Sequence, residues 1–360
     1  QVRCTTASDQ FCLPSKLLAI GGSDGSGNVV SSAEVMDLTN PNNAPRVWSA
    51  VSSMAIKRFA PGAAVLNGKV YVLGGSTTGT SRGAMNTMEV LSTQLDSWAF
   101  KASMSEARYM LGVGVVNGLV CAVGGVGSSD SSLSSVECYN PTTNTFTPKT
   151  SMLGKRTQHA VVSVEDKYLY AIGGHNGTSI LRTCEKYSLE EDKWSSIASL
   201  SVARYRLAAA TMKGYIYAMG GTTGIAYEKK VERYSISANQ WEDVADLGTA
   251  RGMGLGAAIV NHRLYAVGGQ GSKVVEVYNE DENTWAREAD LSTARRSLAV
   301  VAVTSPTTAP TSPTAAPTSP TTAPTTPTTA PTSPTTAPTS PTTALTSPTA
   351  GPTLPTAAPT

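Results

Sequence analysis

A pair of adjacent glycines recurs six times in this chain, each time at the end of a short apolar run. The second glycines of these pairs are Gly22, Gly75, Gly125, Gly174, Gly221 and Gly269, so successive copies are 53, 50, 49, 47 and 48 residues apart. A fixed period in this range indicates a repeat architecture, in which each small unit must stack on its neighbours to bury its apolar surface.

Each copy from the second onward carries a tight-turn signal before its glycine pair. The turns are Asn67-Gly68, Asn117-Gly118, Glu165-Asp166, Lys213-Gly214 and Asn261-His262. Asn-Gly between apolar runs favours a type I′ turn, because both central residues of that turn need positive φ. Each segment therefore predicts two strands joined by a two-residue turn.

Three further positions follow every glycine pair in a constant order. They are a glutamate (Glu34, Glu89, Glu137, Glu185, Glu232, Glu276), a large aromatic residue (Trp48, Trp98, Phe146, Trp194, Trp241, Trp285) and an arginine (Arg58, Arg108, Arg156, Arg204, Arg251, Arg295). The copies show no helical periodicity, and their turn spacing predicts four short strands each. Second strands such as KVYVL (69–73) are apolar at nearly every position, which is typical of a sheet buried on both faces.

Six such sheets in succession favour a β-propeller, because radial repetition protects the sheet edges. Residue 17 begins directly on a second strand, and residues 295–303 match a first strand with no second strand after it. We therefore predict an all-β, six-bladed propeller over residues 17–303, after an N-terminal extension at 1–16. A C-terminal strand is expected to close the ring by joining N-terminal strands two to four.

The repeat resembles the kelch motif in its order of apolar strand, Gly-Gly, polar loop, Glu-x-Tyr, Trp and terminal Arg. Phe146 replaces the tryptophan of the third copy, and Met36 and Leu91 replace tyrosine in the first two. The resemblance implies six four-stranded antiparallel blades, with the glutamates and arginines as scaffold. We expect the glycines to adopt positive φ and the Trp and Tyr rings to pack against their backbone.

Residues 304–360 form a second kind of repeat, with heptads of the type TSPTTAP. They contain no charged residue, aromatic residue or cysteine, and they hold 15 of the 21 prolines. Proline removes backbone donors, so we expect an extended or polyproline II tail. Thr/Ser-rich tracts with proline resemble mucin-like O-glycosylated stalks, the alternative being an unmodified linker.

Composition excludes several classes of function. A net charge of +2 implies no nucleic-acid partner. The sequence contains no run of 18 apolar residues, so it predicts no transmembrane segment. The three histidines and five cysteines show no metal-ligand spacing, so we expect no metal and no cofactor. Cys4 and Cys12 could form a disulfide in an oxidising compartment. No pattern of nucleophile and base is present, and we expect the protein not to be an enzyme.

The candidate binding surface is the face where the loop after strand two and the loop before strand one emerge together. In kelch-type ubiquitin-ligase adaptors that face binds protein ligands. Residues directly after each glycine pair should line its mouth: Ser23, Ser76, Val126, His175, Thr222 and Gln270. Tyr and Arg are enriched at interface hot spots. The candidate ligand-binding residues are Tyr109, Gln158, His175, Tyr205, Arg206 and Arg296, and ordinary solvated loops are the alternative.

Asn176-Gly177-Thr178 is a candidate N-glycosylation sequon in a secretory setting. The favoured hypothesis is a glycoprotein that is secreted or displayed at the cell surface and binds a protein or glycan. One alternative is a fragment of an intracellular, cytoplasmic kelch substrate adaptor of a ubiquitin ligase. The other is a sugar-processing propeller enzyme.

Overall fold

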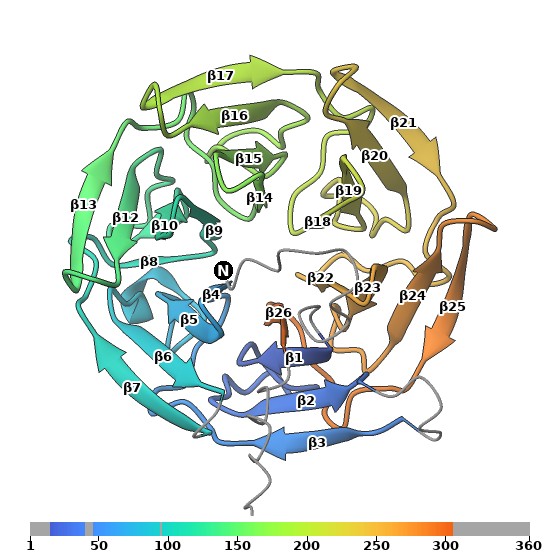
Figure 1. Cartoon of the computed structure of the whole chain (residues 1–360), viewed down its shortest axis with the longest axis horizontal. Coiled ribbons are helices and arrows are strands. Elements are labelled where there is room, and N and C mark those ends of the chain that lie inside the picture. The colour runs from blue at the N-terminus through green and yellow to red at the C-terminus, as the bar shows by residue number, and fades with distance from the viewer. Residues whose placement is uncertain (1–14, 40–45, 94–95, 305–360) are drawn as a thin grey trace, which may run out of the picture. The chain divides into compact units, whose positions relative to one another are not determined.

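The computed structural model describes residues 15–39, 46–93 and 96–304. These residues form six four-stranded antiparallel sheets arranged as the blades of a propeller (Figure 1), so the predicted all-β fold is confirmed. The predictions for the Cys4–Cys12 pair and for the Thr/Pro-rich tail lie outside the described residues.

The blades follow the order of the chain, apart from the first. Blade 1 contains β26 (Ala299–Val303), β1 (Lys16–Ile20), β2 (Ala33–Asp37) and β3 (Trp48–Val51). Blade 2 contains β4 (Gly62–Leu66), β5 (Lys69–Leu73), β6 (Met88–Ser92) and β7 (Ser97–Lys101). Blade 3 contains β9 (Gly112–Val116), β10 (Leu119–Val123), β12 (Val136–Asn140) and β13 (Thr145–Lys149).

The remaining blades repeat this plan. Blade 4 contains β14 (Ala160–Val164), β15 (Tyr168–Ile172), β16 (Cys184–Ser188) and β17 (Lys193–Ile197). Blade 5 contains β18 (Ala208–Met212), β19 (Tyr215–Met219), β20 (Val231–Ser235) and β21 (Gln240–Val244). Blade 6 contains β22 (Gly256–Val260), β23 (Arg263–Val267), β24 (Val275–Asn279) and β25 (Thr284–Glu288). The short strands β8 (Arg108–Tyr109) and β11 (Val126–Gly127) pair with each other, and one 3₁₀ turn, η2, spans Ser81–Gly83.

The ring is closed as predicted. β26 pairs antiparallel with β1, and Leu18 lies opposite Val301. The first strands β4, β9, β14, β18, β22 and β26 contact one another around the axis (Figure 1). Strands from the two ends of the propeller sequence therefore share one blade.

The five predicted turns have positive φ at both central residues, and so have all twelve glycines of the six pairs. The groups that hydrogen-bond these glycines are backbone carbonyls and not the Trp and Tyr rings that we expected to pack against them. The Gly22 N–H donates a hydrogen bond of 2.8 Å to the carbonyl of Arg58 in the next blade, and the other second glycines bond the next arginine carbonyl in the same way. The glycine pairs thus join neighbouring blades through backbone rather than packing under Trp and Tyr.

The aromatic residues instead lie on the outer strands. The ring centroids of Tyr187 and Trp194 are 5.2 Å apart, and the Trp194 indole Nε1 donates to the carbonyl of Thr150 in the preceding blade at 3.0 Å. The equivalent tryptophans of blades 1, 2, 5 and 6 donate likewise. The phenyl ring of Phe146 carries no N–H donor, so blade 3 lacks this hydrogen bond.

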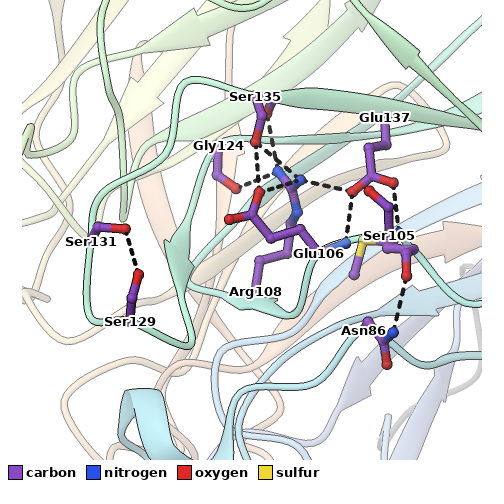
Figure 2. Close-up of polar contacts among 10 residues, drawn as sticks. Asn86, Ser105, Glu106, Arg108, Gly124, Ser129, Ser131, Ser135 and Glu137 are labelled. Atoms are coloured by element: carbon purple, nitrogen blue, oxygen red, sulfur yellow. Dashed lines mark hydrogen bonds and ion pairs between the residues drawn. The ribbon is translucent and has the colours of Figure 1, made fainter. Parts of the chain in front are cut away.

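The repeated arginine and glutamate form a buried ion pair in every blade. Arg108 is fully buried, and its guanidinium donates to the carbonyls of Gly124 and Ser135 and to Glu137, the last at 2.9 Å (Figure 2). The second oxygen of Glu137 accepts the N–H of Ser105 at 2.7 Å. A buried charge of this kind is tolerated only when it is paired and hydrogen-bonded. The pair therefore fastens the incoming loop to the end of the second strand and to the third.

Candidate functional site

The loop after the second strand and the loop before the first strand of each blade emerge on one face, as the sequence predicted. In five blades, the residue after the glycine pair forms an antiparallel bridge with the residue after the arginine. These pairs are Ser23–Arg296, Ser76–Phe59, Val126–Tyr109, His175–Thr157 and Thr222–Tyr205. We call this surface the loop face.

These bridges bury most of the residues that were predicted to line the mouth of the propeller. Ser23, Ser76, Val126 and Thr222 are buried, with exposed fractions of 1%, 0%, 7% and 4%. The hydroxyls of Ser76 and Thr222 bond within their own loops, to the carbonyls of Thr80 at 2.6 Å and of Ala226 at 2.7 Å. The prediction that these four residues line the mouth is therefore wrong, and His175 and Gln270 are the members of that set with exposed surface.

Four of the candidate residues form one chain of contacts. The rings of His175 and Tyr205 are 5.8 Å apart, and the guanidinium of Arg206 lies 5.4 Å from the Tyr205 ring centroid. Arg206 Nε donates to Gln158 Oε1 at 2.5 Å. These residues lie in the loops of blades 4 and 5, and all four are partly exposed.

The other two candidates are placed differently. Tyr109 is only 7% exposed, and the pKa of its hydroxyl is raised, mainly by burial and further by the charge of Asp130, while the charge of Arg206 opposes the rise. Arg296 belongs to blade 1, opposite blade 4 in the ring, and its Nε donates to Ser23 Oγ at 2.9 Å. Tyr109 therefore borders the cluster from below the surface, and Arg296 is separate from it.

Sequence reasoning missed two exposed apolar side chains in a blade 5 loop that is bridged to Tyr205 through Thr222. Ile225 and Tyr227, in the loop after β19, are 98% and 41% exposed. A Cβ on Gly252 of the neighbouring blade would lie 1.9 Å from Tyr227 Cδ1, so that glycine leaves room for the tyrosine ring. The signal was present as two apolar residues in the otherwise polar loop TTGIAYEKK. We call His175, Tyr205, Arg206, Ile225 and Tyr227 the blade 4–5 patch.

At the axis, six residues with positive φ form a ring: Ala60, Met110, Gln158, Arg206, Gly254 and Ser297. The N–H groups of five of them donate to the carbonyl of the preceding member, for example Arg206 to Gln158 at 2.8 Å and Gln158 to Met110 at 2.9 Å. Gly254 lies three residues after its arginine instead of two. Within the described part of the chain its N–H has no partner, and the ring is interrupted there.

The described residues were also compared with the patterns of a metal site, a membrane span and a glycosylation site. Within residues 15–39, 46–93 and 96–304, no three His, Cys, Asp or Glu side chains lie together as metal ligands would. The same segments contain no helix that is long and apolar enough to cross a membrane. Asn176 of the sequon is partly exposed, and its side-chain oxygen accepts from the N–H and hydroxyl of Thr178, both at 2.9 Å.

One disulfide within the described residues was not predicted from the sequence. Cys121 and Cys138 lie opposite each other on β10 and β12 and form a disulfide, while Cys184 is a buried free thiol. Spacing along the sequence could not reveal the pair, because it depends on the register of two strands separated by a long loop.

Comparison with known proteins supports the same architecture. The family profile of the Kelch motif matches residues 57–105, 107–153, 155–201, 203–248 and 251–292, which together exceed half of the chain. The first copy, split by ring closure, lies outside these matches. Among solved structures, the "Structure of YjhT" superposes with a TM-score of 0.62 at 14% identity, covering 77% of this chain and 97% of that one. At this identity the likeness concerns the fold alone.

Curated relatives are similar over shorter stretches. Kelch-like protein 28 of Homo sapiens is 31% identical over 171 residues, which cover 48% of this chain and 21% of that protein. Kelch-like protein 7 of Rattus norvegicus is 38% identical over 68 residues, or 19% of this chain and 11% of that protein. Kelch repeat and BTB domain-containing protein 2 of Cowpox virus (strain GRI-90 / Grishak) is 38% identical over 52 residues, or 14% and 9%. The chain thus spans about a fifth or less of the length of each.

Proposed function

Because the chain belongs to the kelch-repeat family, we propose that it is a non-enzymatic module that binds a protein partner through the blade 4–5 patch. The observation that carries this proposal is the continuous contact of His175, Tyr205 and Arg206. Ile225, 98% exposed, lies in a loop of the same blade that Thr222 bridges to Tyr205. Tyrosine and arginine dominate the energetics of protein interfaces, and an exposed aliphatic side chain gains most when a partner covers it.

The scaffold around the patch favours recognition over catalysis. Each blade repeats the same buried ion pair and glycine bonds, while the loop residues differ from copy to copy. A rigid frame with variable loops is a common basis for binding surfaces. The kelch propeller is consistent with a protein-binding module, and a glycan is the second ligand class that such a surface could take.

We further propose that the protein is secreted or displayed at the cell surface on its Thr/Pro-rich tail. The Cys121–Cys138 disulfide favours this location, because disulfides persist in oxidising compartments. The alternative is an intracellular adaptor, which the name of the BTB-containing relative favours. Alkylation of thiols in the native source before lysis, followed by mass spectrometry, decides between them: a disulfide supports the first, and two alkylated thiols support the second.

The binding proposal predicts an asymmetric effect of two substitutions. In Arg206→Ala, the partner loses a guanidinium that offers five donors, and we expect binding to weaken by about 2 kcal/mol or more. The variant should fold, because blade 2 carries alanine at this ring position, in Ala60. In the matched control His262→Ala, on the exposed turn of the opposite face, binding should not change.

The measurement is capture of partners from the native source by the immobilised full-length chain, with quantitative mass spectrometry of wild type and both variants. Partners of the patch are those depleted by Arg206→Ala and retained by His262→Ala. Depletion by His262→Ala instead would mean that the opposite face binds. Equal capture by all three chains would refute the patch.

A further inference from the structure

The sequon at Asn176 has no role in the proposed binding of a partner. Asn176 lies partly exposed in the loop after β15, and its side-chain oxygen accepts from the N–H groups of Thr178 and Ser179 and from the Thr178 hydroxyl, at 2.8 to 2.9 Å. Its amide nitrogen, the atom that an N-linked glycan is attached to, makes no hydrogen bond within the described residues. The turn therefore holds the carbonyl side of this amide and leaves the acceptor nitrogen free.

A groove of about 300 Å³ lies beside this asparagine, and Asn176 is part of its lining. The rest of the lining comes from the loop that enters blade 4 (153–156), from the loop after Asn176, and from β16 and β17, the outer strands of that blade (Figure 1). The volume is at the lower end of the range for small-molecule sites. It suits a single sugar residue rather than a longer chain.

Two residues of the entering loop distinguish this place from its equivalents in the other blades. Leu153 is 62% exposed, and the other copies carry smaller residues there: Ala55, Ser105, Ser201, Gly248 and Ser292. Gly154 follows it, where the other copies carry side chains: Ile56, Glu106, Val202, Thr249 and Thr293. A Cβ on Gly154 would approach only Glu185 Oε1, at 4.0 Å, so the missing side chain leaves open space. An exposed apolar side chain and a gap thus occur in the blade that carries the sequon.

The lining is fixed in place and almost neutral. The Leu153 N–H donates to Glu185 Oε2 at 2.7 Å, and Arg156 pairs with Glu185 Oε1 at 2.7 Å, so the buried charges compensate each other. Lys155 is exposed and has no ion pair or hydrogen bond within the described residues, which leaves its ammonium free to donate. An apolar side chain next to a free donor suits a sugar ring, which has apolar C–H surface and polar hydroxyl or acetamide groups.

We propose that Asn176 carries an N-linked glycan whose first N-acetylglucosamine residue packs in this groove, against Leu153 and beside Lys155. The inference rests on the proposed secreted location, because N-glycans are added to Asn-x-Ser/Thr in surface loops of secreted proteins. No residue of the blade 4–5 patch lines the groove, so the docked sugar leaves that patch open to a partner.

The first test is the mass of the Asn176 peptide from the native source, with and without a peptide N-glycosidase, which converts the glycosylated asparagine to aspartate. We expect a glycan that the enzyme removes. In chains secreted from an N-glycosylating host, Thr178→Ala should lose this glycan and Thr178→Ser, which keeps the sequon, should retain it. An unmodified Asn176 in the native chain would overturn the proposal.

The same sample, alkylated before lysis, separates this failure from failure of the proposed location. An unmodified Asn176 together with an intact Cys121–Cys138 disulfide would refute the glycan and leave the secreted location standing. An unmodified Asn176 together with two alkylated thiols would refute both. Neither outcome bears on partner capture, which is measured with Arg206→Ala.

The second test concerns the groove and uses full-length chain that an endoglycosidase has trimmed to one N-acetylglucosamine on Asn176. We expect a nuclear Overhauser effect between the acetamide methyl of the sugar and the Leu153 methyls. In urea, the unfolding equilibrium constant should be about threefold smaller or less than that of Thr178→Ala from the same host, because the sugar covers apolar surface. The same two chains from a host without N-glycosylation give the effect of the lost hydroxyl alone.

Matched variants locate the contact. Leu153→Ser copies the residue of three other repeats and should abolish the stabilisation by the sugar, while Phe100→Ser, at an exposed apolar residue of blade 2, should preserve it. Gly154→Thr, which copies two other repeats, should fill the gap and weaken the Overhauser effect to Leu153. Absence of that effect in the wild type, or stabilisation that survives Leu153→Ser, would mean that the sugar stands in solvent and would overturn the docking.

Discussion

At the scale of single residues, His159 shows how strongly the interior of a blade interface can change acid–base behaviour. Burial, and secondarily the positive charge of Arg156, lower the pKa of His159 from 6.5 to about 3. Between these two values the unfolded chain binds a proton that the folded chain excludes. Stability therefore rises with pH across this window and is lost as the pH falls from 6.5 toward 3.

The variant His159→Leu should remove this dependence. We expect the free energy of unfolding of the wild type to fall faster with decreasing pH than that of the variant, the slopes differing by up to about 1.4 kcal/mol per pH unit. Urea unfolding at pH 7, 6, 5 and 4 measures both slopes. His262→Leu, on an exposed turn, serves as the control and should keep the wild-type slope; parallel curves for wild type and His159→Leu would contradict the assignment.

At the scale of elements, one cross-strand position distinguishes blade 3 from its neighbours. The second and third strands of the other blades carry the pairs Leu18–Val35, Tyr71–Val90, Tyr170–Lys186, Tyr217–Arg233 and Tyr265–Val277 there. Blade 3 carries the Cys121–Cys138 disulfide, which closes a loop of sequence separation 17. Blade 3 also lacks the tryptophan hydrogen bond, because Phe146 occupies that position.

Reduction of the disulfide should destabilise the propeller. Closing a loop of about 15 residues limits the unfolded chain and is worth roughly 3 kcal/mol, so we expect a loss of about that size on adding reductant. Denaturant unfolding with and without reductant measures it. The variant Cys121→Leu/Cys138→Val, which copies the blade 1 pair, should be insensitive to reductant, and Cys184→Val should respond like wild type. A wild-type midpoint that ignores reductant would show that this link adds no stability.

At the scale of the whole molecule, the ring depends on a strand donated from the far end of its sequence. β26 supplies the inner strand of blade 1 and contacts the first strands of blades 2 and 6. Its residues Ala299, Val301 and Val303 are buried, with exposed fractions of 7%, 6% and 2%. β26 is therefore both the edge strand of blade 1 and part of the axial core.

Deletion of residues 296–303 should open blade 1 and destabilise the entire propeller. Burial of two valines alone corresponds to about 3 to 6 kcal/mol, and β1 would also lose its pairing partner. Thermal unfolding followed by circular dichroism compares this variant with the full chain and with a control lacking residues 309–360, which we expect to melt like the full chain. Unchanged melting of the 296–303 deletion would mean that the ring is closed elsewhere.

The sequence by itself determined the number of blades, the strand order, the five tight turns and the closing strand. These features follow from local rules: positive φ at Asn-Gly and Gly-Gly, apolar runs of strand length, and a period that repeats them. The sequence also indicated the face on which the candidate loops emerge, since antiparallel strands alternate in direction.

Only the tertiary structure decided how the units are joined and which side chains remain exposed. The pairing of Arg58 with Glu89, the Cys121–Cys138 disulfide and the axial ring depend on contacts between strands or blades that no local preference encodes. The same contacts bury Ser23 and Thr222 and leave Ile225 in solvent. Packing across blade interfaces fixes these outcomes, because the exposure of a loop side chain depends on what the neighbouring blade places against it.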